Sequence, residues 1–353
     1  MLFLTAREKN EWRTLADEAL ASKSGPERLM ADIRPNLVPM FDYYLGAFLA
    51  AKGQVERGRQ WLAAGALMED EKLMSNSYLS SFLERQRGKM IMPAVVFADP
   101  KPYIHFSGVP AIQDARQKFL RHCSLSLPKF KGPVRLMDIG CGDGALTAAF
   151  IQAMRSAGKT GDIAEVALID RSPAMLEVAK TVVGRVVKPE AINAAAGKIE
   201  DLSGKIDRHY DLVVSSLAFH HMPLEQKRVH LKNLKSRMDH FIIFELDANH
   251  DLPEQFSPEL SLSAYQMYGR LINMVFMHDA PLELALLSVD AFLMTEEISM
   301  LVQPRGIRND YHMLKTQWHD LFKETLAPDF SCLCDSACYA DEYTELFTLH
   351  YGH

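Results

Sequence analysis

The sequence lacks a long apolar run, a surplus of basic residues and a secretory signal. Its 353 residues contain no stretch of about eighteen consecutive apolar residues, so we expect no membrane-spanning segment. The apolar beginning, Met1 to Leu4, is too short for a signal peptide and has no basic residues before it, which predicts a cytoplasmic protein. The formal net charge of -6 and the lack of a long Lys/Arg run predict no general affinity for nucleic acid.

Cysteine is also scarce, and only five residues are present. Three of them, Cys332, Cys334 and Cys338, lie close together, which raises the possibility of a metal or redox cluster. Their spacing is C-x-C-x-x-x-C, whereas zinc sites are built from paired C-x-x-C units. We therefore interpret them as small residues in or beside a strand.

The first 110 residues carry the apolar periodicity of helices, for example at Trp12, Leu15 and Ala19. Residues 43–70, with a turn at Gly53, resemble one tetratricopeptide-type helical hairpin. Tetratricopeptide arrays need several copies to bury a continuous core. We therefore interpret residues 1–110 as a helical cap or dimerisation region, which predicts a homodimer formed through these helices.

From Val134 onward, short apolar runs alternate with amphipathic segments, which predicts an α/β domain whose parallel sheet is covered by helices on both faces. We assign residues 111–353 to this domain and expect a mostly helical insertion at about 255–328. The predicted strands are 134–139, 165–170, 191–196, 210–216 and 240–247, with helices at 145–157, 173–184 and 223–238. A final strand pair is expected at 330–334 and 344–352, on either side of a turn-like segment at 336–343.

The glycine-rich turn after the first predicted strand is the strongest chemical motif, and it contains Asp138, Gly140, Cys141, Gly142 and Gly144. Glycines let the backbone approach a ligand closely, and the following helix offers free N–H groups and a positive dipole end. The pattern is also compatible with a dinucleotide site. However, a carboxylate at Asp138 would be unfavourable beside a pyrophosphate, whereas it suits an ammonium group.

Asp138 and these glycines resemble motif I of the class I S-adenosylmethionine (SAM) dependent methyltransferases. The segments beginning at Asp170 and Ser215 also resemble family segments, so that the resemblance covers residues 134–250. It implies a Rossmann-like, doubly wound, mostly parallel seven-stranded sheet that ends in an antiparallel hairpin. It also implies that SAM is the cofactor and S-adenosylhomocysteine (SAH) the product. The implied contacts include Asp138, Gly140, Cys141, Gly142 and Gly144.

Further cofactor contacts are expected where the second and third strands end. Asp170, followed by Arg171, is placed to accept hydrogen bonds from both ribose hydroxyls, and its alternative role is to cap the next helix. The resemblance implies that Ile199 and Glu200 frame the adenine. Lys198 departs from the family pattern, because an acidic residue is usual at that position.

After the fourth strand, the resemblance implies that Ser215 and Leu217 line the region of the sulfonium and methyl groups. His220 and His221 follow, and one of them is a candidate general base because imidazole titrates near neutrality. The alternative role for this pair is packing and hydrogen bonding at the start of a helix.

Substrate contacts are expected at the end of the fifth strand and in the insertion. Glu245 lies at the end of the predicted fifth strand and His250 follows it, and the carboxyl end of this strand faces the ligand crevice. We predict no metal there, because the residues lack the spacing typical of a site for a hard cation. Arg305, Arg308 and Tyr311 form a candidate clamp for a carboxylate or phosphate, and the alternative is a solvated loop.

The predicted function is SAM-dependent methyl transfer to a small-molecule acceptor by direct in-line displacement. The His-His segment and the helical cap favour a small acceptor, and the N-P-P-Y type signature of base and glutamine methylation is absent after the fourth strand. One alternative is an inactive scaffold that keeps the SAM-binding fold and uses its N-terminal helices for protein interaction. Another, a nicotinamide-dependent oxidoreductase, is disfavoured by Asp138.

Overall fold

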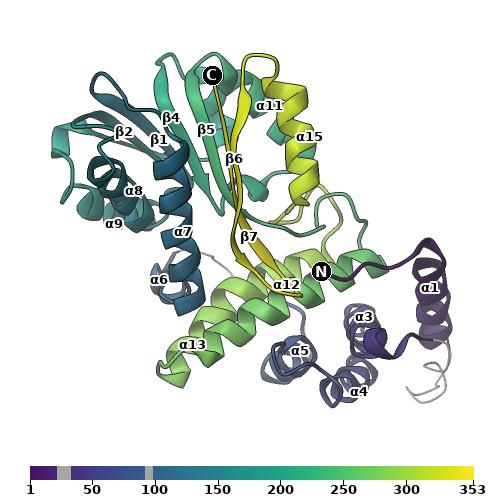
Figure 1. The fold of residues 1–353 in the computed structure, drawn as a ribbon. Helices are drawn as coiled ribbons and strands as arrows, with labels where there is room; N and C mark the ends of the chain where they lie inside the picture. Colours follow the sequence, from purple (N-terminus) through teal and green to yellow (C-terminus); the bar gives the residue numbers. More distant parts are fainter. Residues whose placement is uncertain (22–32, 92–97) are drawn as a thin grey trace. The chain divides into compact units, whose positions relative to one another are not determined.

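Seven strands of the computed structural model form one sheet, in the order β3-β2-β1-β4-β5-β7-β6 (Figure 1). Neighbouring strands from β1 to β5 are parallel, whereas β7 is antiparallel to both β5 and β6. The predicted Rossmann-like fold with a terminal antiparallel hairpin is therefore confirmed. The strands are β1 (Val134–Ile139), β2 (Ile163–Asp170), β3 (Ile192–Ala196), β4 (Tyr210–Ser216), β5 (Met238–Leu246), β6 (Ser331–Ala340) and β7 (Glu345–Gly352).

The structure describes residues 1–21, 33–91 and 98–353. The chain separates by contacts into two compact units. The helical unit comprises residues 1–96, 248–311 and 341–344, and the sheet unit comprises residues 97–247, 312–340 and 345–353. Most of the insertion expected at 255–328 thus groups with the N-terminal helices. The sequence-based division of the chain at residue 110 stays a prediction.

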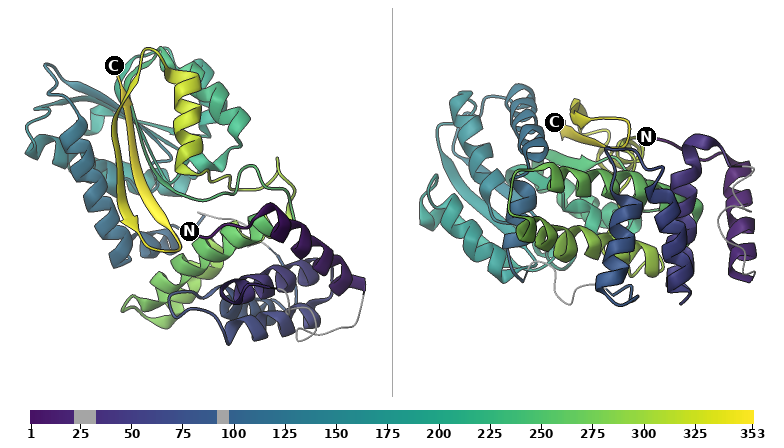
Figure 2. Two further views of the ribbon diagram at one scale, coloured as in Figure 1. Left: turned by 45° about the vertical axis from the view of Figure 1, so that its right-hand side comes forward. Right: turned by 90° about the horizontal axis from the view of Figure 1, so that it is seen from below.

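Helices cover both faces of the sheet (Figures 1 and 2). On one face, Phe119 of α7 stacks on Phe150 of α8, with ring centroids 6.2 Å apart. On the other face, Trp318 of α15 packs into a buried cluster with Phe219 and Phe241. Both faces are therefore buried, as the continuous apolar strands require. The helices of this unit are α6 (Lys101–Ser107), α7 (Pro110–Ser126), α8 (Ala145–Ser156), α9 (Pro173–Val183), α10 (Ile199–Leu202), α11 (Leu224–Lys235) and α15 (Lys315–Leu326).

Strand β1 lies between β2 and β4, at the position where the strand order reverses. Asp138 near its end pairs in register with Leu168 of β2 and Val214 of β4. The carboxyl ends of these three strands therefore meet at one edge of the sheet. Such a switch point is where ligands bind in open α/β sheets.

Strand β6 is longer than the sequence predicts. It continues through residues 336–340, which we expected to form a turn, and that prediction is wrong. Polar residues do not end the strand because β6 is an edge strand with a solvent-facing side. Cys332, Cys334 and Cys338 lie within it as free thiols, which agrees with the strand interpretation.

The helical unit contains the N-terminal helices and most of the insertion. Helices α3 and α4 pack as a hairpin around the turn at Gly53, and α12 packs against α3 and α5. No helix in the described ranges is long and apolar enough to cross a membrane. The longer helices of the unit are α1 (Ala6–Ala21), α3 (Val38–Ala51), α4 (Val55–Ala66), α5 (Ser75–Arg85), α12 (Pro258–Met277), α13 (Leu282–Ser288) and α14 (Met294–Val302).

Replacing Gly144 by alanine should destabilise the sheet unit more than the same change at Gly158. Both glycines have positive φ, 74° and 64°, where an L-residue costs about 1–2 kcal/mol. A Cβ at Gly144 would also lie 2.8 Å from the Cα of Ala179, whereas nothing lies within 4 Å of one at Gly158. Overpacking costs about 1–3 kcal/mol of unfolding free energy in addition, and only at Gly144. We therefore expect a lower urea midpoint for Gly144→Ala than for Gly158→Ala. Equal midpoints for the two variants would contradict this account of how α8 packs on α9.

Candidate active site

The glycine-rich turn after β1 packs directly against the loop that follows β4. Gly140 has a φ of 72°, and a Cβ on it would lie 2.2 Å from the Cβ of Ala218, so that only glycine fits. The amide of Gly142 donates a hydrogen bond to Asp170 Oδ2 at 2.9 Å. The structure thus brings together residues from the ends of β1, β2 and β4, as the sequence predicts.

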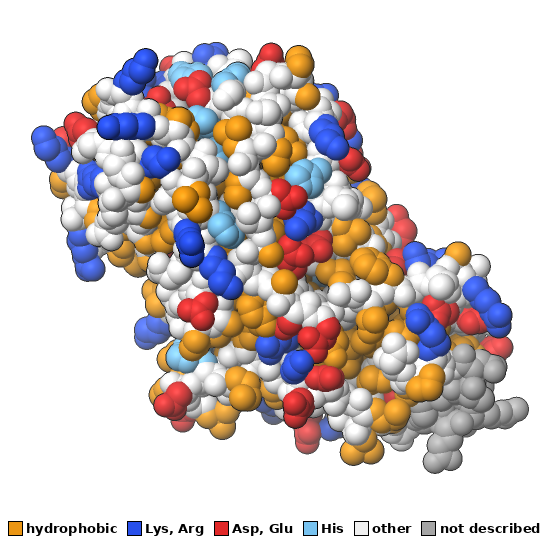
Figure 3. Space-filling view, viewed as in Figure 1, with side chains coloured by type: hydrophobic (Ala, Val, Ile, Leu, Met, Phe, Trp, Pro, Cys, Tyr) orange, Lys and Arg blue, Asp and Glu red, His pale blue; other side chains and the backbone are white. Residues whose placement is uncertain are grey.

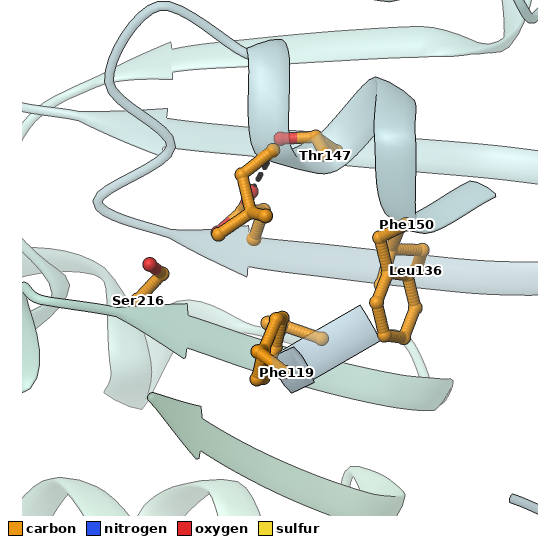
Figure 4. A pocket seen from close by; sticks show the side chains of 8 residues that line it. Phe119, Leu136, Thr147, Phe150 and Ser216 are labelled. Atoms are coloured by element: carbon orange, nitrogen blue, oxygen red, sulfur yellow. Dashed lines mark hydrogen bonds between the residues drawn. The ribbon is translucent and has the colours of Figure 1, made fainter. Parts of the chain in front are cut away.

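A small cavity adjoins Asp138 (Figure 4). The hydroxyl of Thr147 donates to Asp138 Oδ2, whereas Oδ1 is buried without a hydrogen-bond partner. Burial raises the pKa of Asp138 to about 7, against the effect of the Thr147 hydrogen bond, and the charge of Asp170 raises it further. A cationic ligand group would satisfy this oxygen. The cavity is lined by Phe119, Leu136, Asp138, Leu146, Thr147, Phe150, Val214 and Ser216.

Ser216, and not the predicted Ser215, lines this cavity (Figure 4). Successive side chains of a strand point to opposite faces, so neighbouring serines cannot both do so. The hydroxyl of Ser215 is fully buried and donates to the carbonyl of Ile139 at 3.1 Å. The predicted place of Ser215 beside the sulfonium and methyl groups stays a prediction. Leu217 follows with a φ of 49°, and its amide donates to the carbonyl of Phe244 at 2.8 Å.

The end of β2 is organised around Asp170. Besides Gly142, this carboxylate accepts a hydrogen bond from the amide of Ser172 at 2.8 Å. Ser172 itself caps α9, because its hydroxyl accepts from the amide of Met175, so the capping alternative for Asp170 is wrong. Burial raises the pKa of Asp170, against the effect of these two backbone hydrogen bonds. The adjacent Arg171 is exposed.

The other predicted cofactor residues flank this edge of the sheet. Ile199 is buried and Glu200 is half-buried, and both lie in α10 just after β3. Lys198 is the residue before this helix. Cys141 is buried within the glycine turn, and burial raises the pKa of its thiol well above the usual range. A thiol at this position stays protonated and acts by packing.

A buried histidine–carboxylate pair lies just after β4. Glu245 Oε2 is 2.7 Å from His220 Nδ1, and both side chains are almost inaccessible, with exposures of 0% and 3%. Glu245 Oε1 accepts hydrogen bonds from the amides of Ala218 and Phe219. Glu245, predicted as a substrate contact, thus holds the loop that carries His220. This hydrogen bond gives His220 a role in local structure, and its predicted role as a general base stays a prediction.

Two further histidine rings lie beside His220. The ring of His312 stacks on it with centroids 3.9 Å apart, and that of His221 lies 4.3 Å away. Ligand atoms of His220, Glu245 and His312 lie within 4.8 Å of one another, a spacing that a metal ion could bridge. Within this group, Glu245 and His220 already share a hydrogen bond. The absence of a metal stays a prediction.

The residues predicted to clamp an anion are held by groups of the helical unit itself. Arg305 forms an ion pair with Asp251 at 2.7 Å, and Arg308 donates to the carbonyls of His250 and Pro253. Arg308 is buried, so the solvated-loop alternative is wrong for it. The hydroxyl of Tyr311 accepts a hydrogen bond from Gly306. His250 is fully buried, and its ring stacks on that of Tyr268 with centroids 6.0 Å apart.

Fold and site together define a class I SAM-dependent methyltransferase. Residues 131–325, more than half of the chain, match the sequence model of a family described as a methyltransferase domain, and the chain belongs to that family. No curated protein matches the chain in sequence. SAM is the cofactor of this enzyme class, and the residues present fit it, because Asp138 offers an unpaired buried oxygen beside the glycine turn.

Several solved structures are similar to this chain. SCL7 from Oryza sativa is 14% identical, with 82% of this chain and 93% of that chain covered and a TM-score of 0.58, which shows a shared fold. Magnesium protoporphyrin IX methyltransferase from Synechocystis PCC 6803 with bound SAH is 14% identical, with 80% and 100% covered and a TM-score of 0.41. A putative O-methyltransferase from Nostoc punctiforme PCC 73102 is 13% identical, with 88% and 73% covered and a TM-score of 0.44.

The affinity for SAH should fall as the pH drops below about 7. Below its pKa of about 7, Asp138 is protonated in the free enzyme, and the ammonium group of SAH favours the carboxylate, so that binding releases a proton. The association constant should therefore fall about tenfold per pH unit below pH 7 and level off above it. Calorimetric titration between pH 5.5 and 8.5 measures this, with Asp138→Asn expected to bind more weakly and with a flatter pH dependence. An equally steep dependence in both proteins would exclude Asp138 as the titrating group.

Proposed function

We propose that this enzyme transfers the methyl group of SAM to the hydroxyl of a small-molecule acceptor, and that His220 accepts the hydroxyl proton. The observation that carries the proposal is the buried hydrogen bond between His220 Nδ1 and Glu245. A neutral imidazole that donates through Nδ1 has Nε2 as its basic nitrogen. The Glu245 carboxylate also stabilises the imidazolium that forms when Nε2 takes up a proton. This is the arrangement of a general base with an orienting acid.

The proposed reaction is a single displacement. SAM supplies a methyl group that is already activated by its sulfonium. The acceptor oxygen attacks this methyl carbon in line, the new C–O bond forms as the C–S bond breaks, and SAH is the product. The acceptor proton passes to Nε2 of His220, and Glu245 holds the ring in place. The remaining contribution of the protein is positioning and the exclusion of water.

We further propose that Asp138 receives the ammonium group of the cofactor, with Gly140 and Gly142 allowing its close approach. Asp170 would then accept from the ribose hydroxyls, while Ile199 and Glu200 contact the adenine. Ser216 faces the same cavity as Asp138 and has a buried hydroxyl with no hydrogen-bond partner. These roles place the cofactor along the carboxyl ends of β1, β2 and β3, and its methyl group toward the loop after β4.

A small acceptor is favoured by the burial of the proposed base. His220, Glu245 and His312 are each almost inaccessible, which suits an enclosed small molecule better than a macromolecular side chain. On the face drawn in Figure 3, Lys and Arg side chains are interspersed with acidic and uncharged ones, which is not typical of a nucleic-acid surface. A homodimer through the N-terminal helices and a cytoplasmic location remain part of the proposal. The scaffold alternative has no observation in its favour.

The proposal is tested by incubating the enzyme with methyl-labelled SAM and a panel of small acceptors that carry phenolic or aliphatic hydroxyls, thiols or amines. SAH release and label transfer are measured together. We expect transfer to a hydroxyl compound. Turnover confined to thiols or amines would contradict the role of a base. If the rate of SAH formation does not change when any of the acceptors is added, the proposal that an acceptor is methylated is contradicted.

Replacing His220 by glutamine should lower kcat with the hydroxyl acceptor by about 10²–10⁴-fold, because the proton would lose its acceptor. SAH affinity should stay within about threefold, because Asp138 and Asp170 hold the cofactor. Glu245→Gln keeps an oxygen for the loop amides and should lower kcat less. His209→Gln is the matched control, since His209 also lies 2.8 Å from a carboxylate, Asp239, but is exposed. Equal kcat in the His220 and His209 variants would exclude His220 as the base.

A further inference from the structure

The proposed base is covered on one face by a histidine from the segment just before α15. His312 is 1% exposed, and its ring stacks on that of His220 with centroids 3.9 Å apart and planes inclined by 30°. Stacked aromatic rings attract each other and exclude water from the face that they share. The ring of His220 is therefore held at its Nδ1 edge by Glu245 and on one face by His312.

The segment that carries His312 is anchored to the same strand end as Glu245. Asp247, which directly follows β5, accepts a hydrogen bond from the amide of Lys315 at 2.7 Å. Met313 is buried and belongs to the apolar cluster that α15 forms on the sheet. The end of β5 thus positions both rings, with Glu245 bound directly to His220 and Asp247 acting through the backbone of the His312 segment.

The stacking contact adds a restraint that the hydrogen bond alone cannot supply. One hydrogen bond fixes Nδ1 of His220 but leaves the ring free to rotate about the axis from Nδ1 to the Glu245 oxygen. A close-packed ring on the face opposes this rotation, because the two rings would collide or separate. It thereby fixes the direction of the Nε2 lone pair, which lies in the ring plane. Misplacement of a catalytic group by about 1 Å can cost about 10²-fold in rate.

We infer that His312 is a positioning residue for the proposed methyl transfer, and that it acts by stacking on His220. The inference rests on the proposed function, in which His220 accepts the proton of the acceptor. The competing arrangement is a metal ion shared by the two rings, because both offer ligand atoms within 4.8 Å of Glu245 and of each other. An imidazole binds a metal through a lone pair in its ring plane. Two rings stacked at 30° direct these lone pairs along nearly parallel planes, which favours stacking over a shared ion.

The test replaces His312 by alanine, which removes the stacked ring, and by phenylalanine, which keeps a ring but has no nitrogen. With the hydroxyl acceptor, His312→Ala should lower kcat by about 10- to 100-fold, while SAH affinity stays within about threefold. His312→Phe should keep kcat within about threefold of the wild type. His319→Ala is the matched control, because His319 of α15 contacts Tyr351 and Asp335, and we expect unchanged kcat.

Asp247 tests independently how the His312 segment is held. Asp247→Ala leaves the Lys315 amide without its acceptor and should lower kcat a few-fold. Asp247→Asn keeps an acceptor oxygen and should restore most of that loss.

Nitrogen NMR of protein with labelled histidine reads the ring of His220 without any acceptor, and the signals lost in His220→Gln assign it. In the wild type at pH 8, one ring nitrogen should give the signal of a protonated nitrogen and the other that of an unprotonated one, as the hydrogen bond to Glu245 requires. In His312→Ala the two signals should move toward each other as the ring samples other orientations and tautomers. In His312→Phe they should stay apart.

Unchanged kcat, or unchanged His220 signals, in His312→Ala would overturn the inference while leaving the proposed function intact, provided that His220→Gln still lowers kcat. Equal losses in the alanine and phenylalanine variants would also overturn it, because they would indicate a role for a ring nitrogen of His312, such as metal binding. Full kcat in His220→Gln would overturn the proposed function and this inference with it. Retained SAH affinity shows that a variant is folded, and His312→Leu replaces His312→Ala if the latter does not fold.

Discussion

The structure depends on one unfavourable arrangement, a carboxylate buried at the end of β1 with one oxygen lacking a partner. Asp138 lies between two parallel neighbours at the position where the strand order reverses, and burial raises its pKa to about 7. Three residues of the turn that follows, Gly140, Gly142 and Gly144, have no side chain. In the proposed placement of SAM, its ammonium group would offset the free energy that the burial of Asp138 costs in the free enzyme.

The same logic applies to the other buried ionisable groups of the site. Glu245 is held by two backbone amides and by His220. Glu245, which is satisfied, holds the loop after β4, whereas Asp138 keeps one buried oxygen without a hydrogen-bond partner. Because Ala218 packs on Gly140, the loop that carries His220 is positioned by the same turn that receives the cofactor.

Local patterns in the sequence predicted most of the sheet and the edge at which β1, β2 and β4 end. Strand alternation, glycine turns and carboxylates at strand ends are short-range features, so the sequence shows them directly. Ser216 was missed in favour of its neighbour, although strand periodicity, which puts it on the same face as Val214, could have identified it. His312 reaches His220 from a distant part of the chain, through tertiary packing that no local spacing encodes. The extension of β6 was missed because pairing with β7, and not residue preference, stabilises an edge strand.

The most direct test of the central claim is calorimetric titration of the purified full chain with SAH, and with NAD as the competing possibility, at pH 8. The account predicts that SAH binds with one site per chain and that NAD does not bind, because Asp138 stands where a pyrophosphate would have to approach. Binding of NAD without SAH would contradict the account of the glycine turn. Binding of neither would contradict the claim that Asp138 and Asp170 form a cofactor site.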